Sequence, residues 1–402
     1  MKPDMKILED RAEPVTIMEP LLISSSSKHR SRLSDLAIEL TAHSAGFRRS
    51  LPDGILTALA DLVRSMNCYY SNLIEGHDTH PIDIERALKE DYSLNIDKRN
   101  LQLEAKAHIA VQKWIDDGGL QQRSTSKEGI LEIHRRFCEL LPNELLWVEN
   151  PNTGERLKVI AGELRTNDVQ VGRHVPPSPG ALDRFLDKYE KTYSNLGKAE
   201  AIIATAAAHH RLVWVHPFLD GNGRVARLVS YAMLLETLDT GGIWSIARGL
   251  ARKVDTYKEH LARCDLKRRN DLDGRGNLSE EELASFTEFF LQTCIDQVTF
   301  MEELVQPDRL RTRILMWAEE EIRLNNLLPK SEKILEAMLY RGELSRNEIP
   351  DIVNAGERQA RRIVSGLAEH GVLVSTSTRA PLRLAFPAKL ASKWMPGLFP
   401  DR

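Results

Sequence analysis

The sequence predicts a mainly α-helical protein that contains one β-hairpin and ends in a small α+β unit. Apolar residues recur at helical spacing through most of residues 31–300. Turn-forming residues concentrate between residues 150 and 179, around the short alternation Val169-Gln170-Val171. Beyond about residue 305, three short helical patterns precede two strand-like runs. These patterns indicate helices packed around a hydrophobic core, with two short β elements.

Length and composition favour an intracellular protein of two or three domains. The chain has 402 residues, of which 42% are hydrophobic and 28% charged, so it can bury a sizeable core. Its net charge of -3 excludes an overall basic field that would attract nucleic acid. The four scattered cysteines lack metal or redox spacing, and no apolar run has the length of a signal-peptide core or a membrane helix. We therefore expect a reduced, cytoplasmic protein without a membrane partner.

The first region, residues 1–110, is expected to be helical and to carry a long helix at about 52–76. This helix begins near Pro52, because proline is tolerated in a first turn, and it ends at Gly76. Glu75 then lies in the last turn, where the helix dipole disfavours a carboxylate unless a cation is nearby. A solvated surface glutamate is the simpler interpretation of Glu75 at this point.

The second region, residues 111–300, is expected to hold the chemistry. Helices are expected over residues 82–117 and 127–141, and the turn-rich segment 150–179 is the best candidate for the hairpin. Residues 199–215 are apolar enough for a buried central helix, which ends at His216 because a proline follows. A loop and a new apolar helix over 225–238 come next.

The third region, residues 301–402, is expected to hold a connector helix and a winged-helix-like domain. Short helices are predicted over 330–340, 345–354 and 356–370, and two strands follow between 372 and 386. Three helices followed by a β-hairpin is the order of a winged helix. Arg358, Arg361 and Arg362 lie on the third of these helices. Contact with DNA and a protein-docking or dimerising module with a solvated basic face are equally good interpretations.

The densest chemistry lies in residues 216–227, which read HPFLDGNGRVAR. Gly221 and Gly223 let backbone amides approach an anion, and the following helix N-terminus adds positive potential. Arg224 and Arg227 are placed to make forked contacts to phosphate oxygens. This part of the stretch predicts a polyphosphate cradle.

Two other side chains of the stretch imply a cation and a base. Asp220 would be repelled by phosphates unless a hard cation lies between them, and Mg2+ held by one carboxylate and phosphate oxygens is the usual solution. His216, at the mouth, is placed to accept a proton from an incoming hydroxyl. His209 and His210 are interpreted as helix-packing residues, with support of the site as the alternative.

A second loop, residues 271–282, imitates a calcium-binding loop. It has acids at the first and third places, glycine at the sixth and glutamate at the twelfth. Arg275 occupies the fifth place, where its charge would oppose a bound cation. We therefore expect a structural turn, closed by a capping box between Ser279 and Glu282.

The stretch 216–227 resembles the signature of the Fic family, H-P-F-x-[DE]-G-N-G-R-x-x-R, at every defined position. Members of that family generally transfer AMP from ATP to a Ser, Thr or Tyr hydroxyl of a target protein and release pyrophosphate. The resemblance implies that His216 is the general base, Asp220 the Mg2+ ligand and Arg227 the contact of the γ-phosphate. The further nucleotide contacts that it implies are Phe218, Gly221, Asn222, Gly223 and Arg224.

An upstream motif is similar to the inhibitory motif of that family, [ST]-x-x-x-E-[GN]. Ser71, Glu75 and Gly76 occupy its defined positions, as in the class whose inhibitory helix precedes the Fic core. The resemblance implies that Glu75 pairs with Arg227 and keeps the γ-phosphate from binding productively. His77 departs from the asparagine that relatives often carry there.

The predicted hairpin resembles the flap of that family, V-x-V-G-x-H-x-P-P. The matching residues are Val169, Gln170, Val171, Gly172, Arg173, His174, Val175, Pro176 and Pro177. Such a flap is expected to align the hydroxyl-bearing segment of the target by strand addition. Tyr257 lies where relatives place a tyrosine near the nucleotide base, and simple packing is the alternative.

The resemblance as a whole implies an autoinhibited protein adenylyltransferase that uses ATP and Mg2+ and modifies a target protein, itself included. Relatives often dimerise, so a homodimer is expected. Three alternatives stay open. They are transfer of another phosphate-containing group, removal of AMP from a modified target, and a non-catalytic regulator that senses ATP and binds DNA.

Overall fold

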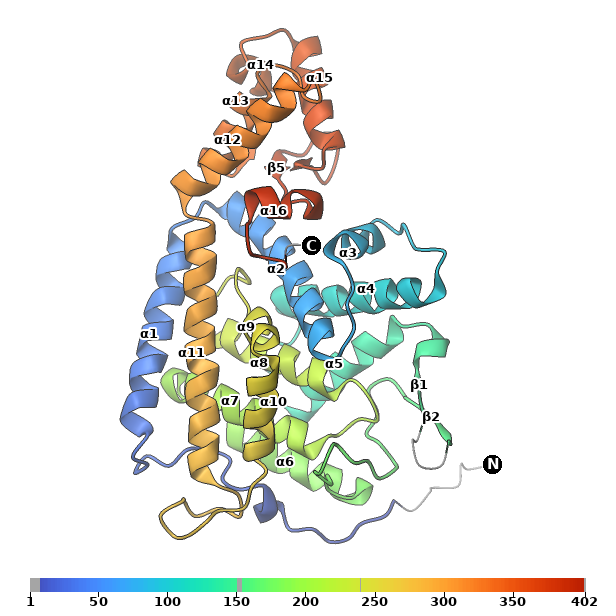
Figure 1. Cartoon of the computed structure of the whole chain (residues 1–402), viewed down its shortest axis with the longest axis vertical. Helices are drawn as coiled ribbons and strands as arrows, with labels where there is room; N and C mark the ends of the chain where they lie inside the picture. Colours follow the sequence, from blue (N-terminus) through green and yellow to red (C-terminus); the bar gives the residue numbers. More distant parts are fainter. Residues whose placement is uncertain (1–7, 150–153, 239, 401–402) are drawn as a thin grey trace.

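The computed structural model describes residues 8–149, 154–238 and 240–400, and it is mainly helical, as predicted (Figure 1). The α-helices up to residue 304 are α1 (Arg30–Arg49), α2 (Asp53–Ile74), α3 (Pro81–Leu88), α4 (Ile96–Asp116), α5 (Lys127–Glu139), α6 (Leu182–Tyr193), α7 (Lys198–Val215), α8 (Asn222–Leu238), α9 (Ala247–Arg252), α10 (Val254–Arg263) and α11 (Glu280–Leu304). Short 3-10 helices lie at Val15–Met18, Asn143–Leu145, Pro179–Ala181 and Ala388–Leu390.

Helix α7 is the centre of the larger body. Its alanine-rich run 204–208 is buried, and these small side chains let α1, α6, α8 and α11 pack against it. Its last residue is Val215, so the helix delivers His216 to the edge of the core. Among the described helices, none is long and apolar enough to cross a membrane.

Helix α2 connects the larger body with the C-terminal part of the chain. It packs on α4, α8 and α9 with one part of its surface and on strand β5 (Leu382–Leu384) with another. The Tyr70 hydroxyl donates a hydrogen bond of 2.9 Å to the carbonyl of Leu398. The domain limit expected at residue 110 falls within α4, and the limit at 300 falls within α11. Helices of the first region therefore share the core of the second.

The β-hairpin lies earlier than the predicted alternation. Strands β1 (Trp147–Glu149) and β2 (Arg156–Lys158) pair antiparallel, with Trp147 opposite Lys158. Residues 150–153, with which the predicted segment begins, lie outside the described residues. The alternation at 169–171 forms no strand, and it contributes a single bridge between Val171 and His174 around a turn at Gly172. The prolines at 176 and 177 lack the amides that a longer ladder would need.

The C-terminal unit contains three helices and two strands where the sequence predicts them, and a further short strand, β3 (Glu343–Leu344), lies between the first and second of these helices. It comprises the helices α12 (Pro307–Arg323), α13 (Ser331–Arg341), α14 (Ile349–Ile352), α15 (Glu357–Glu369) and α16 (Ala391–Trp394), with the strands β3, β4 (Leu373–Val374) and β5. The strands form one antiparallel sheet in the order β3-β5-β4. Figure 1 shows this unit at the end of the molecule, with α16 returning beside α2.

Candidate active site

The stretch 216–227 spans the end of α7, a loop and the start of α8, as the sequence predicts. His216 caps α7 in the left-handed conformation, with φ 50° and ψ 61°. Pro217 prevents the helix from continuing. Gly221, with φ +80°, begins the next helix by accepting a hydrogen bond of 2.9 Å from the amide of Val225. The chain thus turns sharply between two buried helices.

The imidazole of His216 is arranged as a base. Its Nδ1 lies 3.3 Å from the carbonyl of Val213, and because a carbonyl only accepts, Nδ1 carries the proton. No hydrogen bond to Nε2 is present within the described part of the chain, so its lone pair is available. Burial, which is the main cause, lowers the pKa of His216 to about 4. The ring is therefore neutral near pH 7.

The side chains of Phe218 and Asn222, for which the resemblance implies contacts with the nucleotide, shape the loop before α8. Both ends of the Asn222 carboxamide are engaged: Oδ1 accepts from the amide of Phe218 at 2.9 Å, and Nδ2 donates to its carbonyl at 2.8 Å. The Phe218 ring is fully buried and stacks on His134 with centroids 3.8 Å apart. Both side chains are thus engaged within the protein, Asn222 through one donor and one acceptor, and their contact with a nucleotide stays a prediction.

The first-turn amides of α8 remain as anion donors. No acceptor among the described residues bonds the amides of Asn222, Gly223 or Arg224, as is usual for a helix N-terminus. Such amides and the positive end of the helix dipole favour an anion at this position. The cradle therefore consists of backbone groups and the two arginines.

Arg227 is held by three atoms of Ser71 and Glu75. Its Nε donates to the Ser71 hydroxyl at 2.8 Å, and Nη2 donates to the Ser71 carbonyl at 3.1 Å. The same Nη2 lies 2.5 Å from Glu75 Oε1. Burial raises the pKa of the Glu75 carboxyl, but the Arg227 charge outweighs this effect and holds the pKa below its usual value. Glu75 is therefore ionised and paired near pH 7.

Two glycines shape the backbone at this ion pair. Glu75 caps α2, and Gly76 follows with φ +90°, which a residue with a side chain rarely adopts. A Cβ on Gly223 would lie 2.5 Å from Glu75 Oε1 and 3.1 Å from Arg227 Nη1. The glycine at position 223 thus serves the contact with Glu75 as well as the turn into α8.

Arg224 pairs with a glutamate that the sequence interpretation missed. Its guanidinium contacts the buried carboxylate of Glu104 on α4 and lies 2.8 Å from Asp220 Oδ2. His77, the departure from the family pattern, lies with Nδ1 3.0 Å from the other oxygen of Glu104. The sequence does carry a pattern that could have pointed to Glu104. Polar residues recur every four positions at Glu104, His108 and Gln112 and form a polar stripe on a buried helix face.

Residues 167–177, called the flap segment below, lie on the surface beside the end of α7. Val169, Gln170, Val171 and Gly172 are at least partly exposed, and Gln170 Nε2 donates to the Gly172 carbonyl at 2.8 Å. His174 Nε2 donates to the carbonyl of Trp214 at 2.7 Å. This hydrogen bond ties the segment to α7 two residues before His216.

Tyr257 is packed inside the molecule. It is 2% exposed, and its hydroxyl lies 2.7 Å from His209 Nε2, while His209 Nδ1 lies 2.9 Å from the Ser230 hydroxyl. His210 is buried as well and contacts Asp265 and the Leu261 carbonyl. All three side chains are therefore packed inside the molecule, and a contact of Tyr257 with a nucleotide base stays a prediction.

The calcium-like loop is a structural turn. Asp273 Oδ1 accepts from the Ser279 hydroxyl and from the amide of Glu281, both at 2.9 Å. Ser279 caps α11 by accepting from the amide of Glu282 at 3.1 Å. The Glu282 carboxylate pairs with Arg263 and Arg269. Within the described residues, no group of three His, Cys, Asp or Glu side chains is placed to hold a metal ion.

The buried histidines predict that stability falls in mild acid. Burial is the main cause that lowers the pKa of His108 and His209 to about 3 and that of His134 and His216 to about 4. Below the unfolded value of about 6.5, the unfolded chain binds protons that the folded chain does not. The free energy of unfolding should therefore decrease as the pH falls from about 7 to about 5. Urea midpoints at several pH values test this, and a midpoint constant over that range would contradict it.

A family model described as Fic/DOC family matches residues 124–234, which include the whole of 216–227. The protein adenylyltransferase Fic of Drosophila willistoni is 37% identical over 127 residues, which are 31% of this chain and 22% of that protein. The namesake of Drosophila virilis is 31% identical over 172 residues, which are 42% of this chain and 32% of that protein. This chain thus spans less than a third of the length of these relatives.

The fold as a whole has a counterpart among solved structures. A Fic family protein from Desulfovibrio desulfuricans G20 matches 90% of this chain and 98% of its own, with a TM-score of 0.52 and 16% sequence identity. At this identity the likeness concerns the fold alone.

Proposed function

Because the chain belongs to the Fic/DOC family through residues 124–234, we propose that it is a protein adenylyltransferase that moves AMP from ATP to a Ser, Thr or Tyr hydroxyl of a protein. One observation carries the proposal. A neutral histidine with a free Nε2 stands beside a helix N-terminus whose arginine, Arg227, is occupied by a carboxylate. The names of the relatives support AMP as the transferred group.

In this proposal each part of the site has a role. The target oxygen attacks the α-phosphorus and forms a new P–O bond, while its proton passes to His216 Nε2. The bond to the β-phosphate breaks, and pyrophosphate leaves. The free amides of α8 and the arginines 224 and 227 neutralise the phosphate oxygens throughout.

Asp220 fits the part of a Mg2+ ligand. Its carboxylate is half exposed at the start of α8 and supplies the hard oxygen that Mg2+ prefers. When bound, Mg2+ would offset the charge of the phosphates, and Asp220 would hold it. Arg224, which now lies 2.8 Å from Asp220, keeps its second partner Glu104.

Glu75 holds the proposed enzyme in check. Its oxygen takes the position on Arg227 that a phosphate oxygen would need, and the side chain of Arg227 is 3% exposed. While this ion pair is present, Arg227 is not available to the phosphates of a nucleotide, and the Glu75 carboxylate repels them. We therefore propose that ATP binds unproductively until Glu75 moves.

Labelled ATP distinguishes this function from its alternatives. Glu75→Gly protein is incubated with ATP labelled at the α- or the γ-phosphate, and protein-bound label is measured. Transfer of AMP leaves only the α-label on protein, whereas transfer of a terminal phosphate leaves only the γ-label. Loss of label from a previously modified target in the parent protein would reveal AMP removal. If neither the α-label nor the γ-label is found on protein, a non-catalytic role is favoured.

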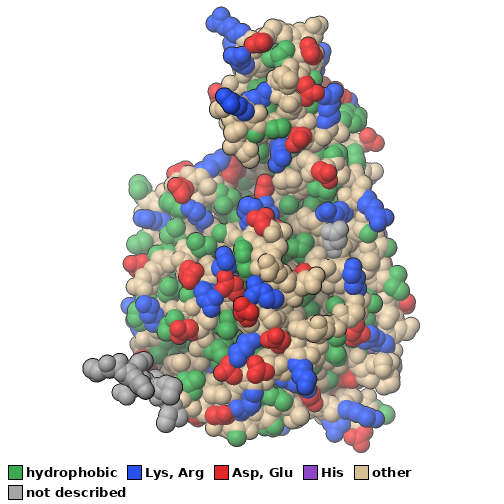
Figure 2. Space-filling model, turned by 180° about the vertical axis from the view of Figure 1, so that it is seen from behind, with side chains coloured by type: hydrophobic (Ala, Val, Ile, Leu, Met, Phe, Trp, Pro, Cys, Tyr) green, Lys and Arg blue, Asp and Glu red, His purple; other side chains and the backbone are tan. Residues whose placement is uncertain are grey.

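Exposed arginines on the C-terminal unit are compatible with DNA as a second ligand. Arg358, Arg361 and Arg362 are exposed on α15, and Arg361 lines a groove of about 580 Å³ beside this helix together with Arg346. On the face shown in Figure 2, basic and acidic side chains are intermixed, so any field that attracts DNA would be local and modest. We propose weak, salt-sensitive DNA binding by the C-terminal unit.

The DNA proposal is tested with the full chain and a labelled random-sequence duplex. Fluorescence anisotropy should show binding that weakens as salt rises, and Arg358→Ala with Arg362→Ala should weaken it further. Arg49→Ala removes an exposed arginine of α1 and serves as the control. Binding unaffected by the α15 substitutions, or absent at low salt, would favour the protein-docking interpretation of this unit.

A further inference from the structure

Arg165 connects the proposed base with both ends of the flap segment, and no sequence motif singled it out. Its Nε donates to the carbonyl of His216 at 2.8 Å. Nη1 donates to the Asn167 carbonyl at 2.9 Å, and Nη2 donates to the Pro177 carbonyl at 2.5 Å. Its own amide donates to the Pro217 carbonyl at 2.9 Å. One planar group therefore touches three points of the chain around the site.

The environment of Arg165 indicates a fixed group. The residue is 2% exposed, and each of its hydrogen bonds in the described structure goes to a backbone carbonyl. Burial lowers its pKa to about 10, so the guanidinium is still charged near pH 7. Because a guanidinium is planar and rigid, the three carbonyls are held in a fixed mutual arrangement.

The backbone conformation of His216 has to be stabilised by its surroundings. A non-glycine residue in the left-handed conformation is strained, and it persists where the surroundings hold it. The hydrogen bond from Arg165 fixes the orientation of the His216 carbonyl. The direction of the Cα–Cβ bond, and with it the position of the imidazole, depends on that orientation.

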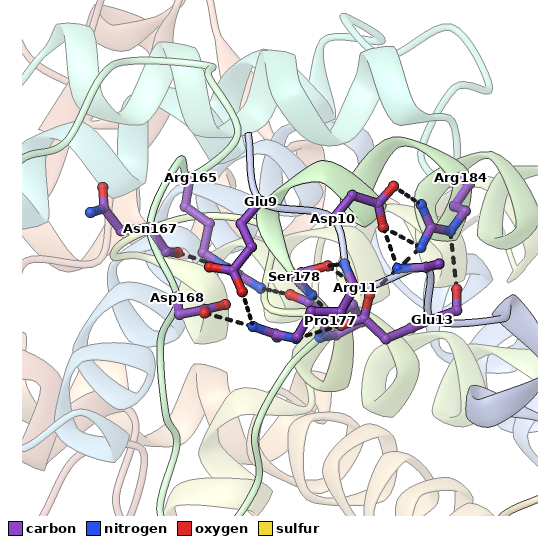
Figure 3. A network of polar contacts seen from close by, with 11 residues as sticks. Glu9, Asp10, Arg11, Glu13, Arg165, Asn167, Asp168, Pro177, Ser178 and Arg184 are labelled. Carbon is purple, nitrogen blue, oxygen red and sulfur yellow. Dashed lines mark hydrogen bonds and ion pairs between the residues drawn. The ribbon is translucent and has the colours of Figure 1, made fainter. Parts of the chain in front are cut away.

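The ends of the flap segment are also held from the outer side. In Figure 3, the arm formed by residues 9–13 lies along the segment, with Arg11 Nη1 2.7 Å from Asp168 Oδ2. The Ser178 hydroxyl donates to Glu13 Oε2 at 2.6 Å. These contacts adjoin Asn167 and Pro177, the two residues that Arg165 binds from inside. The segment is thus clamped at both ends, while its middle stays exposed.

We propose that Arg165 is a positioning residue for the transfer reaction: it sets the distance and angle between the imidazole of His216 and the flap segment that presents the hydroxyl. This inference rests on the proposed function of the same site. It places no contact between Arg165 and the nucleotide, whose cradle is formed at α8. Loss of Arg165 should therefore reduce turnover and leave nucleotide binding intact.

The test compares Arg165→Lys and Arg165→Ala in the Glu75→Gly background. Turnover of AMP transfer should fall by about 10- to 100-fold, because small misplacements of reacting groups cost about that much. KM for ATP should stay within about twofold. In 15N NMR spectra, the pKa of His216 should rise in Arg165→Ala, because the Arg165 charge helps to lower it. Added methylguanidinium should restore part of the turnover of Arg165→Ala.

Arg211→Lys is the matched control. Arg211 is also fully buried and donates to backbone carbonyls, those of Pro20 and Cys264, but it does not touch His216. This variant should lose similar stability and keep its turnover. Equal losses of turnover in both arginine variants, unchanged turnover in Arg165→Lys, or a parallel rise of KM for ATP would overturn the proposal.

A different result is expected if the proposed function itself is wrong. In that case the Glu75→Gly parent itself transfers no AMP. The NMR comparison then decides on Arg165 alone. An altered His216 signal and a raised pKa in Arg165→Ala support the positioning contact, and an unchanged signal refutes it.

Discussion

Glu75→Gly is expected to raise AMP transfer, including transfer onto the protein itself, by at least about tenfold. The substitution removes the carboxylate that lies 2.5 Å from Arg227 Nη2 and leaves Arg227 to bind a phosphate. The Arg227 side chain is 3% exposed and that of Glu75 36%, so solvent screens the pair only in part, and about 1.4 kcal/mol of regained phosphate affinity corresponds to tenfold in an equilibrium constant. The Ser71 contacts to Arg227 remain, so the guanidinium should stay in place.

The measurement is the rate of incorporation of α-labelled AMP into protein, followed by mass spectrometry of a lysate treated with the variant and ATP. Glu369→Gly is the control, since Glu369 is an exposed glutamate at the last position of α15. It should leave the rate at the level of the parent. An unchanged rate for Glu75→Gly, in a variant that still binds ATP, would remove the inhibitory role.

The proposed inhibition would act through helix α2, which is well anchored. α2 is buried against α4 and α9, and its Tyr70 hydroxyl is bonded to the Leu398 carbonyl. Its Asn67 is bonded to Gln112 at 2.7 Å and to the Ser245 hydroxyl at 2.7 Å. Moving the whole helix would break these buried hydrogen bonds, each of which is costly to leave unsatisfied. A change confined to the Glu75 side chain avoids that cost.

The parts of the site that the sequence predicted are those that local rules determine. Proline after His216 ends α7, and the glycines permit the turn into α8, so the path of this stretch follows from neighbours in sequence. The contact of Glu75 with Arg227 joins residues 152 positions apart. It could be expected only because the family resemblance supplied the partner.

The parts of the site that the sequence did not predict depend on packing between distant segments. Nothing local shows that Asn222 would bond the Phe218 backbone, or that Phe218 would stack on a histidine of α5. Arg165 was missed for the same reason, because its acceptors are backbone carbonyls and carry no sequence signal. The alternation at 169–171 has the period of a strand but no neighbouring strand to pair with. Periodicity alone therefore predicted the wrong position for the hairpin.

His216→Ala, placed in the Glu75→Gly background, is expected to reduce AMP transfer by about 10²- to 10⁴-fold, the range that a positioned general base contributes. The imidazole is neutral near pH 7 because burial lowers its pKa to about 4, and its Nε2 is free to take the proton of the target hydroxyl. ATP affinity should stay nearly unchanged, since the phosphate cradle lies at α8. His43→Ala, at a half-exposed histidine of α1, should transfer AMP at the rate of the background protein. Undiminished transfer by His216→Ala would refute the base assignment, and lost ATP affinity would instead place His216 in the cradle.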